Sequence, residues 1–273
     1  MKASLRRAGP ADLAAVWPAV SAARLFATPY DLEYFARVVP WGVQVTPGGE
    51  AVVLERWREH LDILAMRGVW CAERRVPAIV GQVRAIAADL GFGRVLSPLV
   101  SEGAAEAYRR AGMMRVERIV SLRLDGPPRD VRSVAPPPGV VLAEGGRDDL
   151  DALLGADEEC FDGFWHYDRA SLERYLSVER AGLALREGQV IGYTLCTVHA
   201  GVGTLGRLAV VPGERGRGVG SALLSDALAH MGREGATSVS LCTQESNDGS
   251  RRMYARAGMR ESPARVVFLA VRA

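Results

Sequence analysis

Lysine is almost missing from this chain of 273 residues, in which Lys2 is the only one. The chain therefore has no Gly-Lys-Ser/Thr sequence, which excludes the Walker A loop, a phosphate-binding loop that needs it. Positive charge is carried by arginine instead, and the net charge of +2 is small. A charge this close to balance gives no basic field for the phosphates of a nucleic acid. We therefore expect no nucleic-acid partner.

Long apolar runs and paired cysteines are missing as well. No segment reaches the roughly 18 uncharged apolar residues of a membrane-spanning helix, so we expect no membrane partner. The four cysteines are scattered and form no Cys-x-x-Cys pair, so the sequence gives no support for a metal site. Scattered cysteines are typical of free thiols and indicate a reducing cytoplasm. The apolar content of 48% predicts a soluble globular protein.

The most informative motif that is present is a glycine-rich turn between an apolar strand and an amphipathic helix. The strand ends at Val211, Pro212 follows it, and residues 219–228 have the apolar spacing of a helix. Glycine lets backbone N–H groups approach a ligand closely, and a helix N-terminus adds partial positive charge. Together these features predict an anion site of the kind that holds a pyrophosphate. The turn contains Arg215, Gly216, Arg217, Gly218 and Gly220.

The spacing of this turn separates it from a dinucleotide fingerprint. That fingerprint requires Gly-x-Gly-x-x-Gly, but here Gly220 is followed by Ser221, and no acidic residue comes about twenty positions later. The pattern Arg215-x-x-Gly218-x-Gly220, after a strand that ends Leu-Ala-Val-x-Pro, instead resembles the acetyl-CoA motif of the GNAT N-acetyltransferase superfamily. The resemblance implies an α/β (α+β) fold with a mixed, mostly antiparallel sheet flanked by helices, and acetyl-CoA as the co-substrate.

A proline-rich segment at residues 126–139 predicts two domains. It has five prolines and two glycines in fourteen residues, which forbid a continuous helix or a central strand. We therefore expect a semi-rigid linker between residues 1–125 and 140–273. The resemblance to the GNAT superfamily covers residues 140–273 well and residues 1–125 weakly.

The two halves also resemble each other. The first half has Glu106-Ala-Tyr-Arg-Arg-Ala-Gly-Met113 near its end, and the second has Arg252-Met-Tyr-Ala-Arg-Ala-Gly-Met259. The counterpart of the glycine-rich turn falls at residues 71–76, which contain no glycine. Side chains there would block the backbone approach that a pyrophosphate needs. We therefore expect two tandem GNAT-like domains, of which 1–125 is a degenerate copy without the CoA loop and 140–273 is catalytic.

The resemblance also implies which residues bind the donor. In GNAT domains the strand before the turn splays from its neighbour, and the pantetheine arm lies in the gap. The strand backbone and an asparagine would bind the pantetheine, while the turn would hold the pyrophosphate. The residues implied in this way are Leu208, Ala209, Val210, Arg215, Gly216, Arg217, Gly218, Val219, Gly220, Ser221 and Asn247.

The catalytic acid implied by the resemblance is Tyr254, which would lie near the thioester sulfur. A phenol with a pKa near ~10 stays protonated at neutral pH, so it suits a group that gives the leaving thiolate a proton.

A base for the acceptor amine is harder to assign. Ribosomal-protein N-terminal acetyltransferases have a glutamate where this chain has Cys242. An acidic run at residues 157–159 comes just before an aromatic loop at residues 161–165, where GNAT domains shape the acceptor site. From this run we assign the base to Glu159, with His166 or a chain of water molecules as alternatives.

These features predict an acyl-CoA-dependent N-acyltransferase that moves an acetyl group from acetyl-CoA to a primary amine by direct attack. The acceptor is a small molecule or a peptide. One alternative is a small-molecule acetyltransferase similar to the mycothiol synthases, which also have a tandem architecture with one degraded loop. A second alternative is a non-catalytic acyl-CoA sensor or scaffold, in which the first half supplies a partner surface.

Overall fold

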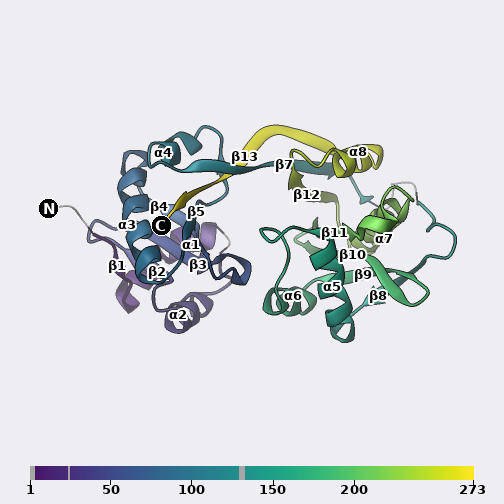
Figure 1. Ribbon diagram of the computed structural model, residues 1–273, viewed down its shortest axis with the longest axis horizontal. Coiled ribbons are helices and arrows are strands. Elements are labelled where there is room, and N and C mark those ends of the chain that lie inside the picture. The colour runs from purple at the N-terminus through teal and green to yellow at the C-terminus, as the bar shows by residue number, and fades with distance from the viewer. Residues whose placement is uncertain (1–3, 24, 129–132) are drawn as a thin grey trace. The chain divides into compact units, whose positions relative to one another are not determined.

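A computed structural model describes residues 4–23, 25–128 and 133–273. The chain forms two compact units (Figure 1). The first unit contains Met1–Arg118 together with Arg265–Ala273, and the second unit contains Ile119–Ala264. Each unit has a mostly antiparallel sheet with helices packed against it, as the sequence predicted.

The first unit places its strands in the order β1-β2-β3-β4-β5, continued by the end of β13. The neighbours pair antiparallel except β4 and β5, which are parallel. The strands are β1 (Arg6–Arg7), β2 (Val43–Val45), β3 (Ala51–Arg56), β4 (Ile63–Trp70), β5 (Arg94–Leu96) and β6 (Val100–Ser101), and the helices are α1 (Pro10–Ala22), α2 (Pro29–Val38), α3 (Val76–Asp89) and α4 (Ala105–Arg109).

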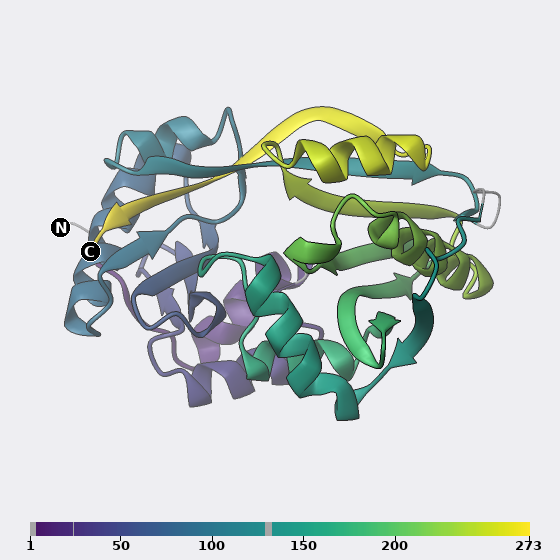
Figure 2. The ribbon, with the colours of Figure 1, turned by 45° about the vertical axis from the view of Figure 1, so that its right-hand side comes forward.

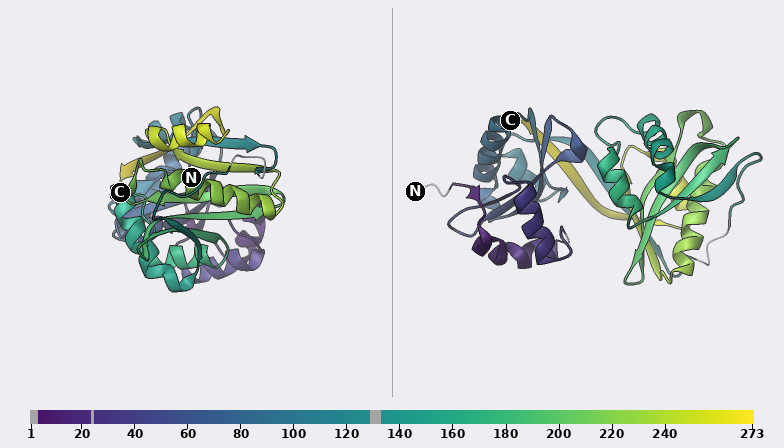
Figure 3. Two further views of the ribbon diagram at one scale, coloured as in Figure 1. Left: turned by 90° about the vertical axis from the view of Figure 1, so that its right-hand side faces the viewer. Right: turned by 90° about the horizontal axis from the view of Figure 1, so that it is seen from below.

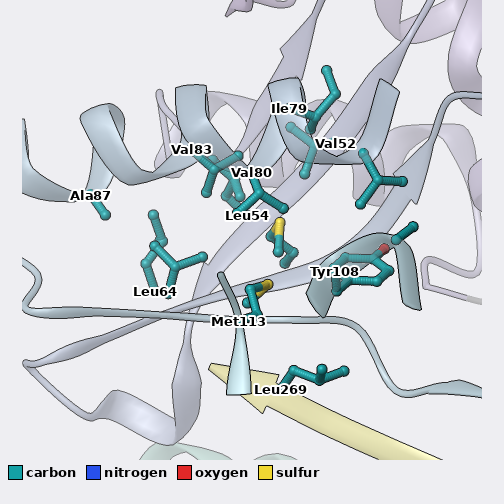
Figure 4. Packing of buried hydrophobic residues seen from close by; sticks show 14 of the residues in the cluster. Val52, Leu54, Leu64, Ile79, Val80, Val83, Ala87, Tyr108, Met113 and Leu269 are labelled. Carbon is teal, nitrogen blue, oxygen red and sulfur yellow. The ribbon is translucent and has the colours of Figure 1, made fainter. Parts of the chain in front are cut away.

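The core of the first unit contains one face of α3 (Figure 4). Ile79, Val83 and Ala87 recur at helical spacing, and each is at most 1% exposed. They belong to one buried cluster with Leu64 of β4 and Tyr108 of α4. Burial of each large aliphatic side chain contributes about 1.5–3 kcal/mol, so this unit has a substantial core of its own.

The second unit repeats this order of elements. Its sheet runs β8-β9-β10-β11-β12-β7, antiparallel except for the parallel pair β11 and β12. Helices α5 and α7 cover opposite faces of the sheet, since Leu195 packs with α5 while its neighbour Cys196 packs with α7 (Figures 2 and 3). The elements are β8 (Val141–Gly145), α5 (Leu150–Cys160), α6 (Arg169–Leu176), β9 (Arg180–Arg186), β10 (Gln189–His199), β11 (Val202–Val210), α7 (Val219–Arg233), β12 (Ser238–Gln244) and α8 (Asp248–Arg256).

Two long strands, β7 (Met114–Asp125) and β13 (Arg260–Arg272), change units along their length. Residues 119–125 of β7 pair with β12 in the second unit, while residues 270–272 of β13 pair with β5 in the first. The last strand of each half therefore completes the sheet of the other unit. This differs from the predicted boundaries, which kept each strand in its own half, because an apolar pattern indicates a strand but not its partner.

The proline-rich segment 126–139 follows β7 and belongs to the second unit. Residues 129–132 of this predicted linker lie outside the described residues. The described end of the segment packs on the unit, since the Val140 N–H donates to the Pro137 carbonyl at 3.0 Å and Val140 is 6% exposed.

Candidate active site

The turn between β11 and α7 requires glycine at two positions. After a single 3-10 turn over Pro212–Glu214, the chain reaches Gly216 with φ +75° and Gly218 with φ +91°. Both values lie in the left-handed region, where an L side chain is strained. Gly218 is also the N-cap of α7, so the glycine sets the direction in which the helix begins.

The backbone N–H groups of this turn are free to bind an anion. The first helical bond of α7 runs from the Ala222 N–H to the Gly218 carbonyl at 3.1 Å. Within the part of the chain that the structure describes, the N–H groups of residues 216–221 donate to no backbone acceptor. Residues 215–218 are exposed. An exposed row of unused N–H groups at a helix N-terminus fits the phosphates of a nucleotide.

Gly220 is required for close packing. A β-carbon added there would lie 3.2 Å from the Met253 sulfur on α8 and 3.6 Å from a methyl carbon of Val210. A side chain there would press on the Met253 sulfur and fill the space between the first turn of α7 and the end of β11. Gly220 therefore keeps the helix N-terminus next to the strand.

The two arginines of the turn have different partners. The Arg215 side chain donates from Nε to the Val210 carbonyl at 2.9 Å and from Nη2 to the Cys160 carbonyl at 3.2 Å. Arg215 therefore braces the turn against β11 and the end of α5. The Arg217 side chain is 63% exposed, and its Nη1 lies 3.7 Å from a Glu214 oxygen. Arg217 is thus the more accessible of the two cations for a phosphate.

Strand β11 splays from β12 along the stretch that leads to the turn. The parallel pairing ends at Leu205 opposite Leu241, although both strands continue. The Val211 N–H donates to the Ile191 carbonyl of β10 at 3.0 Å. Backbone groups alternate in direction along a strand, so those of Ala209 face β10, while those of Leu208 and Val210 face the gap. Backbone binding to a pantetheine arm in the gap therefore stays a prediction for Leu208 and Val210, and the alternation disfavours Ala209.

The two predicted residues of α8 have defined positions. Asn247 is the N-cap, and its Oδ1 accepts the Ser250 N–H at 3.2 Å. Tyr254 is 6% exposed, and burial raises its pKa to about 12 against an opposing hydrogen bond with Ser250. Burial also raises the pKa of Tyr108 in the first unit to about 12. The catalytic role of Tyr254 stays a prediction, because burial alone does not distinguish the two phenols.

The acidic run at the end of α5 divides into one buried and two exposed carboxylates. Asp157 is 0% exposed; it accepts two hydrogen bonds from Arg207 at 2.8 and 2.7 Å and another from the Tyr193 hydroxyl. Hydrogen bonds within the protein therefore occupy both carboxylate oxygens of Asp157. Glu158 and Glu159 are exposed, and the assignment of the base to Glu159 stays a prediction.

His166 and Cys242 are the other two positions considered for a base. The His166 N–H donates to the Asp162 carbonyl at 3.0 Å and closes the turn after α5. Cys242 comes directly after Leu241, the last β12 residue that pairs with β11, so it stands at the start of the gap. Its exposed thiol lies 3.4 Å from the Ser121 hydroxyl.

Sequence reasoning missed a carboxylate at this point of the sheet. Glu179 directly precedes β9, and its Oε2 lies 3.1 Å from where a β-carbon of Gly206 would be. Gly206 is the extra residue of a bulge on β11, next to the last pair with β12. Burial raises the pKa of Glu179 to about 7. The only sequence signal was a glycine inside an apolar strand, which indicates a bulge or a close approach.

Comparison with known proteins agrees with this geometry. Residues 150–259, which contain the turn and all of α8, match the family model described as the GNAT family of acetyltransferases. This part of the chain is a GNAT-family domain. The chain is 28% identical over 211 residues to a mycothiol acetyltransferase of Frankia alni, covering 60% of this chain and 62% of the relative. A mycothiol acetyltransferase of Streptomyces avermitilis is 36% identical over 78 residues, covering 28% and 25% of the two chains.

The similarity to solved GNAT structures extends over nearly the whole chain and shows the fold. A tandem GNAT protein from the clavulanic acid biosynthesis pathway has a TM-score of 0.72 at 17% identity, with 98% of this chain and 97% of that chain covered. A GCN5-related N-acetyltransferase from Sphaerobacter thermophilus has a TM-score of 0.70 at 22% identity, with 98% and 95% covered. Both units thus lie within a fold known for GNAT proteins.

The residues present fit acetyl-CoA, the co-substrate of GNAT enzymes. Free N–H groups line the turn, Gly220 provides the close approach, and β11 leaves its partner where a pantetheine arm would lie. In the described part of the chain, no three or more histidine, cysteine or acidic side chains are grouped to hold a metal ion. Among the described helices, none is both long and apolar enough to cross a membrane.

Proposed function

We propose that the second unit transfers an acetyl group from acetyl-CoA to a primary amine. The observation that carries the proposal is the combination of the free N–H groups at residues 216–221 with the splay of β11 from β12. The first supplies a site for a pyrophosphate, and the second supplies a site for an extended amide-containing arm. Together they are suited to coenzyme A rather than to a simple phosphate.

The donor would be held along one continuous path. The N–H groups of the turn and the exposed Arg217 would bind the pyrophosphate. The Leu208 backbone groups and the Val210 N–H that face the gap would pair with the amides of the pantetheine arm, since the Val210 carbonyl accepts from Arg215. Asn247 uses its Oδ1 as a helix cap, which leaves its side-chain NH₂ to donate to the same arm.

The transfer itself needs a free amine and a protonated leaving group. The amine nitrogen attacks the thioester carbonyl, and backbone N–H groups beside the gap would stabilise the oxyanion that develops. Tyr254 would give a proton to the sulfur as the C–S bond breaks. Burial raises its pKa to about 12, so the phenol holds this proton at neutral pH.

A second candidate acceptor comes from the curated relatives. Two of them are mycothiol acetyltransferases, and the chain spans 62% and 25% of their lengths. We therefore propose a mycothiol-precursor amine as the specific acceptor to test beside simple amines and peptides. A deletion strain that loses acetylated thiols would support this acceptor, and one with an unchanged thiol profile would exclude it.

The experiment that tests the general function is a screen of amines and peptides with acetyl-CoA, read as release of the CoA thiol. We expect release with the intact chain and none with Ser221→Glu. A glutamate at the third position of α7 suits the helix dipole, so it places negative charge against the pyrophosphate without harming the helix. Gly81→Glu is the control, because this glycine of α3 has nothing within 4 Å of an added β-carbon. Binding of acetyl-CoA without release for any amine would favour a non-catalytic sensor.

A further inference from the structure

We propose that Glu179 is the catalytic base that takes a proton from the acceptor amine. This inference rests on the proposed function, and it concerns a residue that neither the sequence motif nor the donor site indicates. It replaces Glu159 in this role.

The first support is the position of the carboxylate. Its three outer atoms, Oε2, Oε1 and Cδ, lie 3.1, 3.6 and 3.7 Å from where a β-carbon of Gly206 would be. A β-carbon at 206 would press on this carboxylate, which would have to shift by a few tenths of an ångström. Gly206 is the bulge residue beside Leu205, at which the pairing between β11 and β12 ends. The carboxylate therefore lies over the point where the gap for the donor begins.

The second support is that one oxygen of the Glu179 carboxylate accepts no hydrogen bond from the described residues. This atom, Oε2, is buried and has no hydrogen-bond partner among the residues that the structure describes. A buried, unsatisfied carboxylate oxygen costs free energy, so it is uncommon without a function. An incoming ammonium group would satisfy this atom. The backbone of Glu179 is meanwhile fixed, because its N–H donates to the Tyr175 carbonyl at 2.7 Å.

The surroundings of Glu179 keep it ready to accept a proton. Burial raises its pKa to about 7, so proton uptake and release are balanced near neutral pH. The neighbouring cation, Arg180, is paired with Asp226 at 2.6 Å. The Cys196 thiol also interacts with Glu179, and burial foremost raises the pKa of that thiol to about 11, which keeps it neutral.

Other carboxylates of the acceptor region lack this combination. Asp157 is more deeply buried, but Arg207 and Tyr193 already occupy its oxygens. Glu159 is exposed on α5. Glu179, unlike Asp157 and Glu159, joins burial to an oxygen without a described partner and a place beside the splay.

The proposed transfer removes two protons from the acceptor nitrogen. Glu179 takes one proton from the ammonium group, and the freed lone pair of the nitrogen forms the C–N bond at the thioester carbonyl. The C–S bond breaks, and its electron pair leaves on the sulfur, which receives a proton from Tyr254. The nitrogen gives its second proton back to the Tyr254 oxygen, and Glu179 releases the first proton to solvent. The products are the amide, the CoA thiol and one proton.

The test compares Glu179→Gln and Glu179→Asp with the intact chain in the CoA-release assay. Glutamine keeps the shape but accepts no proton, so we expect kcat to fall about a hundredfold or more, with the KM for acetyl-CoA little changed. Aspartate keeps a proton acceptor and should recover part of the rate. Glu173→Gln, at an exposed position of α6, is the matched control and should leave the rate unchanged.

The pH profile separates a base from a structural residue. The intact chain should gain rate as the pH rises through about 7, and Glu179→Gln should lose this dependence. A Gln variant that keeps both its rate and its pH profile overturns the role of Glu179, while turnover by the intact chain still supports the acetyltransferase. Failure of the intact chain to bind acetyl-CoA, or to acetylate any amine, overturns both proposals.

Discussion

Arg207 and Asp157 form an ion pair buried inside the second unit, with 7% and 0% of the two residues exposed. The guanidinium donates from Nε at 2.8 Å and from Nη2 at 2.7 Å to the two carboxylate oxygens. Arg207 also donates to the Trp165 carbonyl at 2.8 Å, and Asp157 accepts the Tyr167 N–H at 2.6 Å. The pair thus connects β11, which borders the donor gap, to the loop that follows α5.

Breaking this pair should destabilise the protein strongly. Asp157→Asn should lower the free energy of unfolding by about 3 kcal/mol, because Arg207 is left as a buried charge without a counter-ion. Asp151→Asn is the control on the same helix; its side chain is 83% exposed, and its removal should cost less than about 0.5 kcal/mol. Chemical denaturation measures both values. Equal losses for the two variants would contradict the structural role of Asp157.

The two arginines of the turn should respond differently to salt. Arg217→Ala should weaken acetyl-CoA binding by up to about fivefold at low salt and reduce its salt dependence, because this cation is exposed. Arg215→Ala removes bonds to two backbone carbonyls, so it should weaken binding at every ionic strength and leave the salt dependence unchanged. Calorimetric titrations at several salt concentrations compare the two. The opposite pattern would mean that Arg215 contacts the phosphates.

Loss of the Tyr254 hydroxyl should lower kcat, whereas loss of the Tyr108 hydroxyl should not. Tyr254→Phe should lower kcat at least about tenfold and leave the KM for acetyl-CoA little changed, because only the proton donor is lost. Tyr108→Phe is a close control, since burial raises the pKa of both phenols to about 12. Steady-state CoA release measures the effect. Equal rates for both variants and the intact chain would reduce Tyr254 to a packing residue.

Glu179 should make stability depend on pH in a definite direction. Burial raises its pKa from 4.5 to about 7, so its contribution to stability is fully present below pH 4.5 and is lost as the pH rises through about 7. The full loss is at most about 3 kcal/mol, and solvent around this partly exposed group reduces it. Glu179→Gln should therefore gain stability relative to the intact chain between about pH 5 and about pH 8. Unfolding curves that stay parallel across this range would argue against the raised pKa.

The sequence predicted the local structure of the turn between β11 and α7 better than the surroundings of the acidic run at residues 157–159. The left-handed φ values of Gly216 and Gly218 and the close contacts of Gly220 are features of the turn itself. The spacing of these glycines therefore predicts the turn without knowledge of distant residues. The expected strand at 205–211 is observed as Val202–Val210, and the helix after the turn begins at Val219. Local chemistry therefore predicted local structure.

The rest of the site depends on contacts between distant residues. Asp157 was predicted as part of an acidic run near the acceptor, yet Arg207, fifty positions later, makes it a buried brace. Glu179 meets Gly206 because a bulge on β11 brings that residue under its carboxylate. The exchange of β7 and β13 between the units depends in the same way on partners that periodicity does not specify.

The most direct test of the single acetyl-CoA site is the stoichiometry of acetyl-CoA binding to the full chain, measured by titration calorimetry. We expect one site per chain, because the counterpart of the turn at residues 71–76 lacks glycine. Ser221→Glu should lose this site while a thermal melt shows that the variant remains folded. Two sites per chain, or a single site that survives this substitution, would contradict the assignment.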